Sequence, residues 1–503
     1  MTRKYKIQMK FNFVIAAALI LIAGCAVGPD YQKPDVDTPG KWIYKDTLVS
    51  SDSVYTTISD SDAFTIADTA WWRLFEDSLL NKLIYTGLKQ NSDIKIASAR
   101  VEQYLAYYGI ARSDFYPRLN FEGYQNNGKY SNALTNSQSN PFKSIFELSL
   151  TADWEIDLWG RIRRMNESAR AELFASEESR QGMVLFITSS IASSYIEILT
   201  LKRQLELTKQ TLLSRDTALV LFRLRYDKGD ISLLDLTQLE SDYWYVKSQI
   251  PLFEKQIASA ENNLNVLLGK NPGIVETGII KDSVIVPAVP EGLPSELLLR
   301  RPDIRYAEQI LISANANIGA VKALYYPAIS LSGKLGVASN DLTNLFDPLS
   351  QIWNLGANIF APLFNAGKIK SKVEVAEAQK KQALLTYINT VRSSFRDVEN
   401  ALADQAKTRE QLILLSNRVD ALKLYKDLAY MNFNEGVSSY LEVLDADRSL
   451  FDAQLYYETT RGNLLKSIVN IYTAFAGGWV TKASMDAFQP DKMDEIKEIN
   501  QNK

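Results

Sequence analysis

The sequence of 503 residues predicts a mixed membrane protein in which amphipathic strands and very long helices form one structural unit, present twice in the chain. Three observations support this fold class. The chain matches itself at a spacing of 210 and then 207 residues. Stretches of polar–apolar alternation predict strands with one face in lipid. Proline-free stretches at 161–226 and 368–433 predict helices about 100 Å long.

The composition excludes most classes of enzyme. The chain has no histidine and one cysteine, which removes Ser-His triads, most zinc sites, disulfides and iron–sulfur clusters. A formal net charge of −3 argues against nucleic acid as a partner. No glycine-rich phosphate loop or metal-ligand cluster occurs in the sequence, so we expect no catalytic, cofactor-binding or metal site. A secreted hydrolase that uses only carboxylates is the enzyme alternative.

The N-terminus has the pattern of a secretory signal. Four basic residues precede the apolar run Phe11–Ala23, which is too short to span a bilayer but suits a signal peptide. The run ends in Leu21-Ile22-Ala23-Gly24-Cys25, which resembles a bacterial lipoprotein signal. We expect removal of residues 1–24 and acylation of Cys25, for example with palmitate. An ordinary secretory signal with a chance cysteine is the alternative.

The duplicated unit occupies residues 71–268 and 297–476. A polar arm at 25–70 precedes the first copy, a proline-containing linker at 269–296 joins the copies, and a charged tail at 477–503 is expected to be disordered. The repeat is visible in identical residues at the 210-residue spacing. These include Asp93 and Asp303, Ile94 and Ile304, Tyr116 and Tyr326, Pro117 and Pro327, and Gly123 and Gly333.

Each copy is expected to contribute two strands, at about 117–126 and 142–157 in the first copy and about 327–338 and 351–364 in the second. The alternation is clearest between Phe146 and Asp157, where every second residue is apolar. Asp153, Glu155 and Asp157 could be paired catalytic carboxylates, but the alternation places all three on the polar face. No later apolar run reaches the length of a transmembrane helix, so strands or lipid would make the membrane contact.

The sequence of each copy also predicts three helices: one before the strands, a long one after them, and a shorter return helix. A helix before the strands, at about 78–115 or 303–325, ends at an aromatic-aromatic-proline triplet. The long helix follows the strands, ends at a glycine turn, and returns as a shorter helix at 232–268 or 439–475. The two shorter helices together nearly match the long one, so we expect them to pack against it end to end, with coiled-coil spacing of leucines.

Two motifs have a structural and a functional interpretation. Arg300-Arg301-Pro302-Asp303 could bind an anion, but proline at the first helical position with aspartate beside it is typical of a helix start. Trp71-Trp72 could form a ligand cage, but a packing anchor at a helix start is the interpretation we favour.

The chain resembles the TolC-like outer-membrane efflux proteins of Gram-negative bacteria, and specifically their lipoprotein branch. No single motif is decisive, but their order and spacing are specific. The matching segments are Cys25 with Gly28-Pro29-Asp30-Tyr31, Trp71-Trp72-Arg73-Leu74-Phe75, Leu293-Pro294-Ser295-Glu296-Leu297, Arg300-Arg301-Pro302-Asp303-Ile304-Arg305 and Ala476-Gly477-Gly478-Trp479.

The resemblance implies a homotrimer. Four strands per chain cannot close a barrel, and open edges are not tolerated in lipid. Two chains would give an eight-stranded barrel filled by its own side chains, which is no conduit. Three is the family's number, so the resemblance implies a twelve-stranded β-barrel on a periplasmic tunnel of twelve helices. The protein would be the passive exit duct of a tripartite pump that exports drugs or other small molecules.

The resemblance also implies the protein's place and partners. It would be anchored by lipid in the bacterial outer membrane, extend into the periplasm, and work with a periplasmic adaptor and an inner-membrane RND-type transporter. Type I protein secretion and metal-ion export are the alternatives within the channel class. The chain has no histidine and only seven methionines, and this scarcity of metal-binding side chains argues against export of copper or silver. A periplasmic coiled-coil adaptor without a pore is the alternative outside it.

The family's closed entrance corresponds to the turn after Gly436. In TolC-like proteins the matching positions line this gate, so the resemblance assigns gate roles to Leu441, Glu442, Asp445 and Arg448. The first copy has Leu234, Asp235 and Gln238 at the equivalent positions, so a ring of Asp445 would contain three acids rather than six. A solvated helix with an Asp445–Arg448 pair at i,i+3 is the alternative.

Overall fold

The computed structural model describes residues 26–44, 71–129, 142–278 and 300–475. These residues belong to two compact units. Of the described residues, unit 1 contains 26–35, 100–129, 142–176 and 306–388, and unit 2 contains 36–44, 71–99, 177–278, 300–305 and 389–475. The expected signal peptide with Cys25, most of the arm and linker, and the tail lie outside the described residues.

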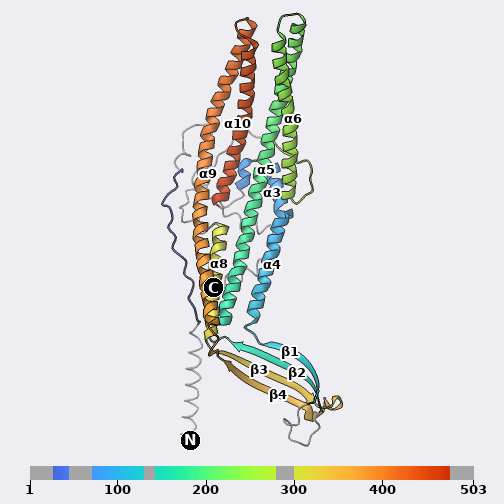
Figure 1. Ribbon diagram of the computed structural model, residues 1–503, viewed down its shortest axis with the longest axis vertical. Helices are drawn as coiled ribbons and strands as arrows, with labels where there is room; N and C mark the ends of the chain where they lie inside the picture. The colour runs from blue at the N-terminus through green and yellow to red at the C-terminus, as the bar shows by residue number, and fades with distance from the viewer. Residues whose placement is uncertain (1–25, 45–70, 130–141, 279–299, 476–503) are drawn as a thin grey trace. The chain divides into compact units, whose positions relative to one another are not determined.

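Unit 1 contains an antiparallel sheet of four strands in the order β1-β2-β3-β4 (Figure 1). The strands are β1 (Arg118–Lys129), β2 (Phe142–Ile156), β3 (Ala328–Ser339) and β4 (Gln351–Phe360). The last strand is shorter than the predicted 351–364, since Pro362 has no amide proton for a sheet hydrogen bond. Short 3-10 helices, η4 (Leu342–Asn344) and η5 (Pro348–Ser350), lie between β3 and β4.

The pairing register gives the whole sheet one apolar and one polar face. Leu150 of β2 pairs with Phe121 of β1 and with Leu335 of β3, and Leu335 pairs with Trp353 of β4. Because side chains alternate along every strand, this row and its neighbours two residues away form one face. Large apolar side chains on that face are exposed in the single chain.

The helices that lead into the strands differ in detail from the prediction. The first is interrupted, as α3 (Ser78–Gln90) and α4 (Ser92–Ser113). Asn91 separates them because its side chain is engaged on both sides: the amide donates to the carbonyl of Leu267 at 2.8 Å, and the oxygen accepts from the Ile94 N–H at 3.0 Å. The asparagine therefore starts α4 as its N-cap.

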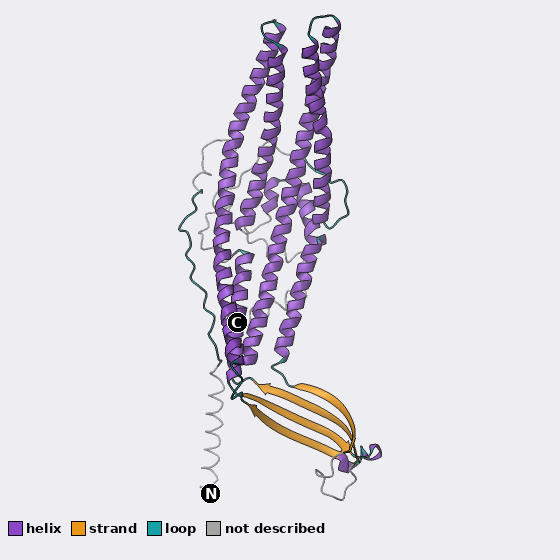
Figure 2. Cartoon of the chain, in the orientation of Figure 1, coloured by secondary structure: helices purple, strands orange, loops and turns teal. Residues whose placement is uncertain are grey.

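In the second copy the helix before the strands is α8 (Pro302–Lys322), and it is followed by the 3-10 helix η3 (Ala323–Tyr325) and then by β3. The long helices are α5 (Arg161–Asp227) and α9 (Lys368–Asn434), and each begins after a glycine with positive φ. Coarsely, the long helices and small sheet agree with the predicted fold class (Figure 2).

Each long helix forms a hairpin with a return helix. These are α6 (Leu233–Leu267), which accommodates Pro251, and α10 (Tyr440–Phe475). In unit 2, α5 runs beside α6 and α9 beside α10 (Figure 1).

A dense core in unit 2 fixes the position of the two tryptophans. The 3-10 helix η2 (Trp71–Phe75) buries Trp71 and Trp72 completely, and the Trp71 ring stacks on Tyr472 with centroids 5.6 Å apart. The pair is therefore a packing anchor, as the structural interpretation predicts.

One helix among the described residues, α5, has a segment long and apolar enough to cross a membrane by length and composition, although the sequence shows no uninterrupted apolar run of that length. Just over half of the segment, 56%, is buried within the chain. Core helices of soluble proteins meet the same criterion, so this is weak evidence for a membrane helix.

Candidate functional site at the ends of the helical hairpins

Near their ends, the hairpins α5–α6 and α9–α10 share one apolar cluster. Buried side chains from all four helices contribute to it, including Phe222, Leu239, Ala429 and Val443. The two hairpins are therefore packed together in unit 2, and any movement of one against the other would expose apolar surface.

Three aromatic rings form the centre of this cluster. Phe222 of α5 lies 4.1 Å from Tyr440 of α10, and Phe433 of α9 lies 5.3 Å from Tyr440, measured between ring centroids. Tyr440 is 2% exposed, and burial raises the pKa of its hydroxyl. The first residue of α10 is thus held by packing.

A buried ionic network lies next to the cluster. The guanidinium of Arg215 on α5 donates to Asp242 of α6 at 2.6 Å and pairs with Asp447 of α10 at 2.7 Å. The three side chains are at most 3% exposed. Burial alone would lower the pKa of Arg215, but the two carboxylates together outweigh it and raise that pKa.

Three further side chains extend the network towards solvent. Tyr430 of α9 donates to Asp447 at 3.0 Å, and Lys426 of α9 pairs with the same carboxylate at 3.3 Å. Arg448 of α10 donates to Asp242 at 2.8 Å. Three cations and two carboxylates from four helices are thus connected, with a net charge of +1.

The residues with predicted gate roles lie on α10 beside this network. Leu441, Glu442 and Asp445 are exposed, and Tyr425 of α9 donates to Asp445 at 3.4 Å. The alternative Asp445–Arg448 pair is wrong, because Arg448 reaches Asp242 of the other hairpin instead.

The equivalent residues of the first copy have a different role. Asp235 forms a capping box with Ser232: its N–H donates to the serine hydroxyl and its carboxylate accepts the serine N–H. Leu234 is exposed and Gln238 half-buried. The structure therefore ties Asp235 to the start of α6.

Sequence reasoning missed the buried network. The sequence pattern that could have revealed the network is a pair of acidic residues at helix positions where the apolar spacing predicts a buried side chain. Asp242 follows buried Leu239 by three residues, and Asp447 follows buried Leu444 by three. That spacing places both acids on the buried faces of their helices.

In unit 1, the chain that follows Cys25 is tied to the junction of β2 and α5. The Val27 N–H donates to the carbonyl of Trp159 at 3.0 Å, and Arg164 pairs with Asp30 at 2.6 Å. Cys25 itself lies outside the described residues, but the chain two residues later is fixed where strand gives way to helix.

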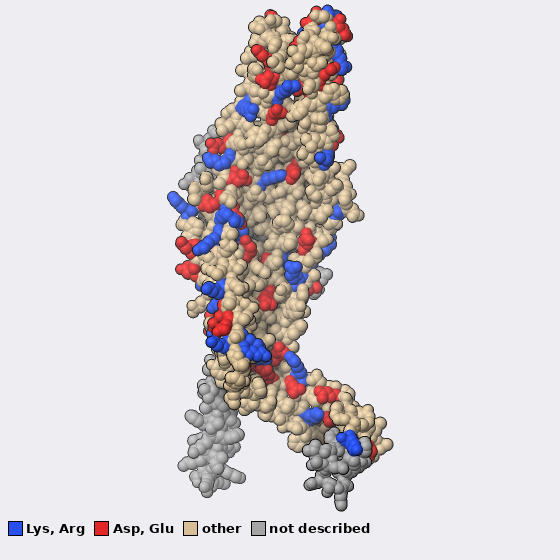
Figure 3. Space-filling model, in the orientation of Figure 1, with Lys and Arg blue, Asp and Glu red and all other residues tan. Residues whose placement is uncertain are grey.

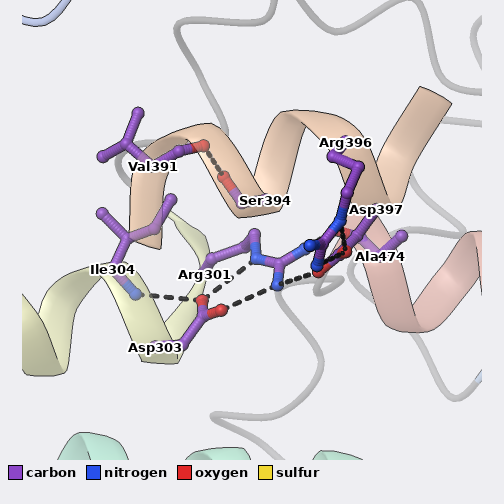
Figure 4. Close-up of polar contacts among 8 residues, drawn as sticks. All are labelled: Arg301, Asp303, Ile304, Val391, Ser394, Arg396, Asp397 and Ala474. Atoms are coloured by element: carbon purple, nitrogen blue, oxygen red, sulfur yellow. Dashed lines mark hydrogen bonds and ion pairs between the residues drawn. The ribbon is translucent and has the colours of Figure 1, made fainter. Parts of the chain in front are cut away.

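The RRPD motif forms a helix junction in unit 2. Arg301 donates to Asp303 and to the carbonyl of Ala474 at 2.9 Å, and pairs with Asp397 at 3.4 Å (Figure 4). It joins the start of α8 to α9 and to the end of α10. Since its donors are used within the chain, the helix-start interpretation holds.

Two of the carboxylates considered as catalytic candidates, Glu155 and Asp157, are hydrogen-bonded to the start of α5. Glu155 accepts two hydrogen bonds from Arg161, at 2.9 and 2.7 Å. Asp157 accepts the N–H groups of Ile162 and Arg163 at the start of α5. Within the described ranges, no group of three or more potential metal ligands occurs.

A sheet with one continuous apolar face, in a chain with long helical hairpins, defines an outer-membrane channel of the TolC-like type. The chain matches the family model "Outer membrane efflux protein" over residues 83–270 and 293–477, and it belongs to that family. It is therefore an outer-membrane efflux protein and not an enzyme.

Relatives and solved structures agree. The solvent efflux pump outer membrane protein SrpC of Pseudomonas putida is 34% identical over 94% of this chain and 99% of that protein. The cation efflux system protein CusC of Escherichia coli O6:H1 is 31% identical over 93% and 98%. The probable outer membrane lipoprotein SilC of Salmonella typhimurium is 30% identical over 94% of this chain and 100% of that protein.

Among solved structures, CusC superposes with a TM-score of 0.80 and 29% identity, over 90% of this chain and all of that one. The outer-membrane channel OprN superposes with a TM-score of 0.82 and 27% identity, over 91% of this chain and all of that one.

Proposed function

We propose that three copies of this chain form the exit duct of a tripartite efflux pump, with a twelve-stranded barrel on a tunnel of twelve helices. The observation that carries this is the sheet with one apolar face and two open edges, β1 and β4. In lipid, unpaired edge groups cost several kcal/mol each, so the edges must pair with other copies. Three copies give twelve strands, enough for an open interior.

The test is the mass and conductance of the purified protein. Reconstituted protein should have three times the mass of the mature protomer and should conduct ions across a planar bilayer. A monodisperse, non-conducting monomer that retains its β-sheet content would contradict the proposal.

We propose a periplasmic adaptor and an inner-membrane RND-type transporter as partners, and small organic molecules as cargo. The names of the relatives include solvent and toluene pumps as well as cation pumps. The absence of histidine and the few methionines favour the organic group. Metal-ion export and type I secretion remain the alternatives, which co-purification of the transporter would separate.

We further propose that residues 1–24 are removed and that Cys25 carries the lipid anchor. The arm contacts support this, because Val27 is bonded where the apolar face of the sheet ends. Mass spectrometry should find an acylated N-terminal Cys25, and Cys25→Ala should abolish acylation while the trimer still assembles. An unmodified Cys25 in the mature protein would contradict the assignment.

Finally, we propose that Leu441, Glu442, Asp445 and Arg448 line the periplasmic gate. Exposure of the first three residues in the single chain supports this. Three-fold symmetry would bring three copies of Asp445 together in the throat, where their carboxylates would favour cations. Leu234, Asp235 and Gln238 would lie at the tip without adding acids to that ring.

A further inference from the structure

Unit 1 contains a cavity of about 430 Å³ at the end of the sheet. Its walls come from the end of β2, the start of α5, residues 323–328, and the segment from β4 into the first turns of α9. Its volume lies within the range of small-molecule sites.

One wall of the cavity is aromatic and rigid. Trp159 and Tyr326 stack with ring centroids 4.8 Å apart and planes 25° apart. The indole N–H of Trp159 donates to the carbonyl of Pro327 at 2.8 Å, which fixes the ring. Phe360 and Pro362 add further apolar surface.

The charged groups of the cavity leave a positive excess. Glu155 is paired with Arg161, and Asp157 pairs with Arg163 at 3.3 Å and accepts backbone N–H groups of α5. Lys368 and Lys372 lie one helical turn apart on α9. Their ammonium groups make no hydrogen bond or ion pair to any residue that the structure describes. Two unmatched cations therefore adjoin an apolar, aromatic wall.

The register assigns three of the four strand residues of the cavity to the polar face, and the fourth, Ile156, to the apolar face. Ala328 pairs with Phe360, and both alternate with the apolar pair Ile329 and Ile359. Glu155 is likewise on the polar face. The next step rests on the proposed function: in a trimeric barrel the polar face lines the duct, so the cavity opens to water and cargo rather than to lipid.

We propose that this cavity binds a small amphipathic organic anion, with a carboxylate, sulfonate or phosphate at Lys368 and Lys372 and an apolar body against Trp159 and Tyr326. A cation would meet the two lysines and be repelled, while a fully apolar molecule would leave their charges unmatched. The site would hold such anions transiently in the duct wall and so favour them over cations of the same size.

The test uses the trimer in nanodiscs and two soluble probes that share one ring system, 1-naphthalenesulfonate and 1-naphthylmethylammonium. Calorimetric titration, with empty nanodiscs subtracted, should show saturable binding of the sulfonate at one site per protomer and no saturable binding of the ammonium. The double variant Lys368→Gln/Lys372→Gln should weaken sulfonate binding by about tenfold, as expected for the loss of two partly exposed charge interactions.

Lys370→Gln is the matched control. Lys370 lies on the same turn of α9 and pairs with Glu374 at 3.7 Å, but it does not line the cavity. Its variant should change sulfonate affinity less than twofold. Equal affinities in the wild type and the double variant, or equal losses in the double variant and Lys370→Gln, would overturn the site.

The outcome separates this inference from the proposed function. If the trimer conducts but does not bind 1-naphthalenesulfonate, for example because a neighbouring copy fills the cavity, the inference is wrong and the duct stands. If no trimer forms and no conductance is seen, the duct itself is wrong.

Discussion

The hairpins α5–α6 and α9–α10 are copies of one unit, but their ends are held by different means. The first return helix begins with a polar capping box between Ser232 and Asp235. The second begins with the buried ring of Tyr440, packed on Phe222 of the other hairpin. The first end is thus stabilised within itself, while the second depends on its neighbour.

The charged side chains at the two ends differ in the same way: those of the first hairpin pair within it, and those of the second pair with its neighbour. On the visible face, the end of α5–α6 carries a denser group of charged side chains than the end of α9–α10 (Figure 3). Glu240 pairs with Arg223 of its own hairpin at 2.8 Å, whereas its counterpart Asp447 reaches Arg215 of the other hairpin. At the same position of the repeat, one copy therefore has an ion pair within its hairpin and the other has a link between hairpins.

The largest expected effect comes from removing the shared cation. Arg215→Met leaves Asp242 and Asp447 buried without their common partner, which should destabilise the hairpin ends by about 3–5 kcal/mol per protomer. Hydrogen–deuterium exchange at the ends of α6 and α10 measures this as a lower opening free energy.

The matched control is Arg223→Met, which breaks the exposed pair with Glu240 and should cost less than about 1 kcal/mol. Replacing Arg215, Asp242 and Asp447 together by apolar residues should recover most of the loss. If the two single arginine variants exchange alike, the buried network does not link the hairpins.

A second divergence lies along the long helices. Glu178 of α5 corresponds to Leu385 of α9 at the 207-residue spacing. Burial raises the pKa of Glu178 to about 7 despite its 2.5 Å pair with Arg305, and one carboxylate oxygen has no hydrogen-bond partner among the described residues. Since the folded state then binds a proton that the unfolded state releases, stability should fall as the pH rises from about 4.5 to about 7.

Glu178→Gln should remove this pH dependence and raise stability at pH 8 by about 3 kcal/mol per protomer. Urea denaturation of the trimer at pH 5 and pH 8 measures it. Glu206→Gln, an exposed change on the same helix, is the control. A pH dependence that persists in Glu178→Gln would assign it to other groups.

The two hairpin ends also show what the sequence could predict. The proline-free stretches and the glycine turns located the ends of the long helices and of the return helices to within one residue, because these signals are local. The link from Arg448 to Asp242 spans 206 residues and depends on how two hairpins pack. The local i,i+3 pair with Asp445 was therefore the natural but wrong alternative, and no periodicity could have identified Arg215 as the partner of two distant acids.

The next effect is on conductance and tests the proposed gate. Asp445→Ala should weaken block by divalent cations by about three- to fivefold, because three carboxylates leave the throat. Gln238→Ala, at the matched position of the first hairpin, should leave block unchanged. Arg448→Ala should raise conductance, since it releases α10 from Asp242. If none of these variants changes conductance or block in planar bilayers, the gate residues are wrongly assigned.

The smallest effect separates the two helix starts. Ser232→Ala removes the hydroxyl that accepts the Asp235 N–H at 3.2 Å, and loss of such a cap costs about 1 kcal/mol. Ser439, its counterpart, accepts the Glu442 N–H at 3.3 Å through its backbone carbonyl, which survives in Ser439→Ala. Exchange should therefore accelerate about fivefold in the first turn of α6 and less than twofold in that of α10. If hydrogen exchange accelerated equally in both first turns, α6 and α10 would both depend on a side-chain cap. Packing of Tyr440 would then not take the place of a cap at the start of α10.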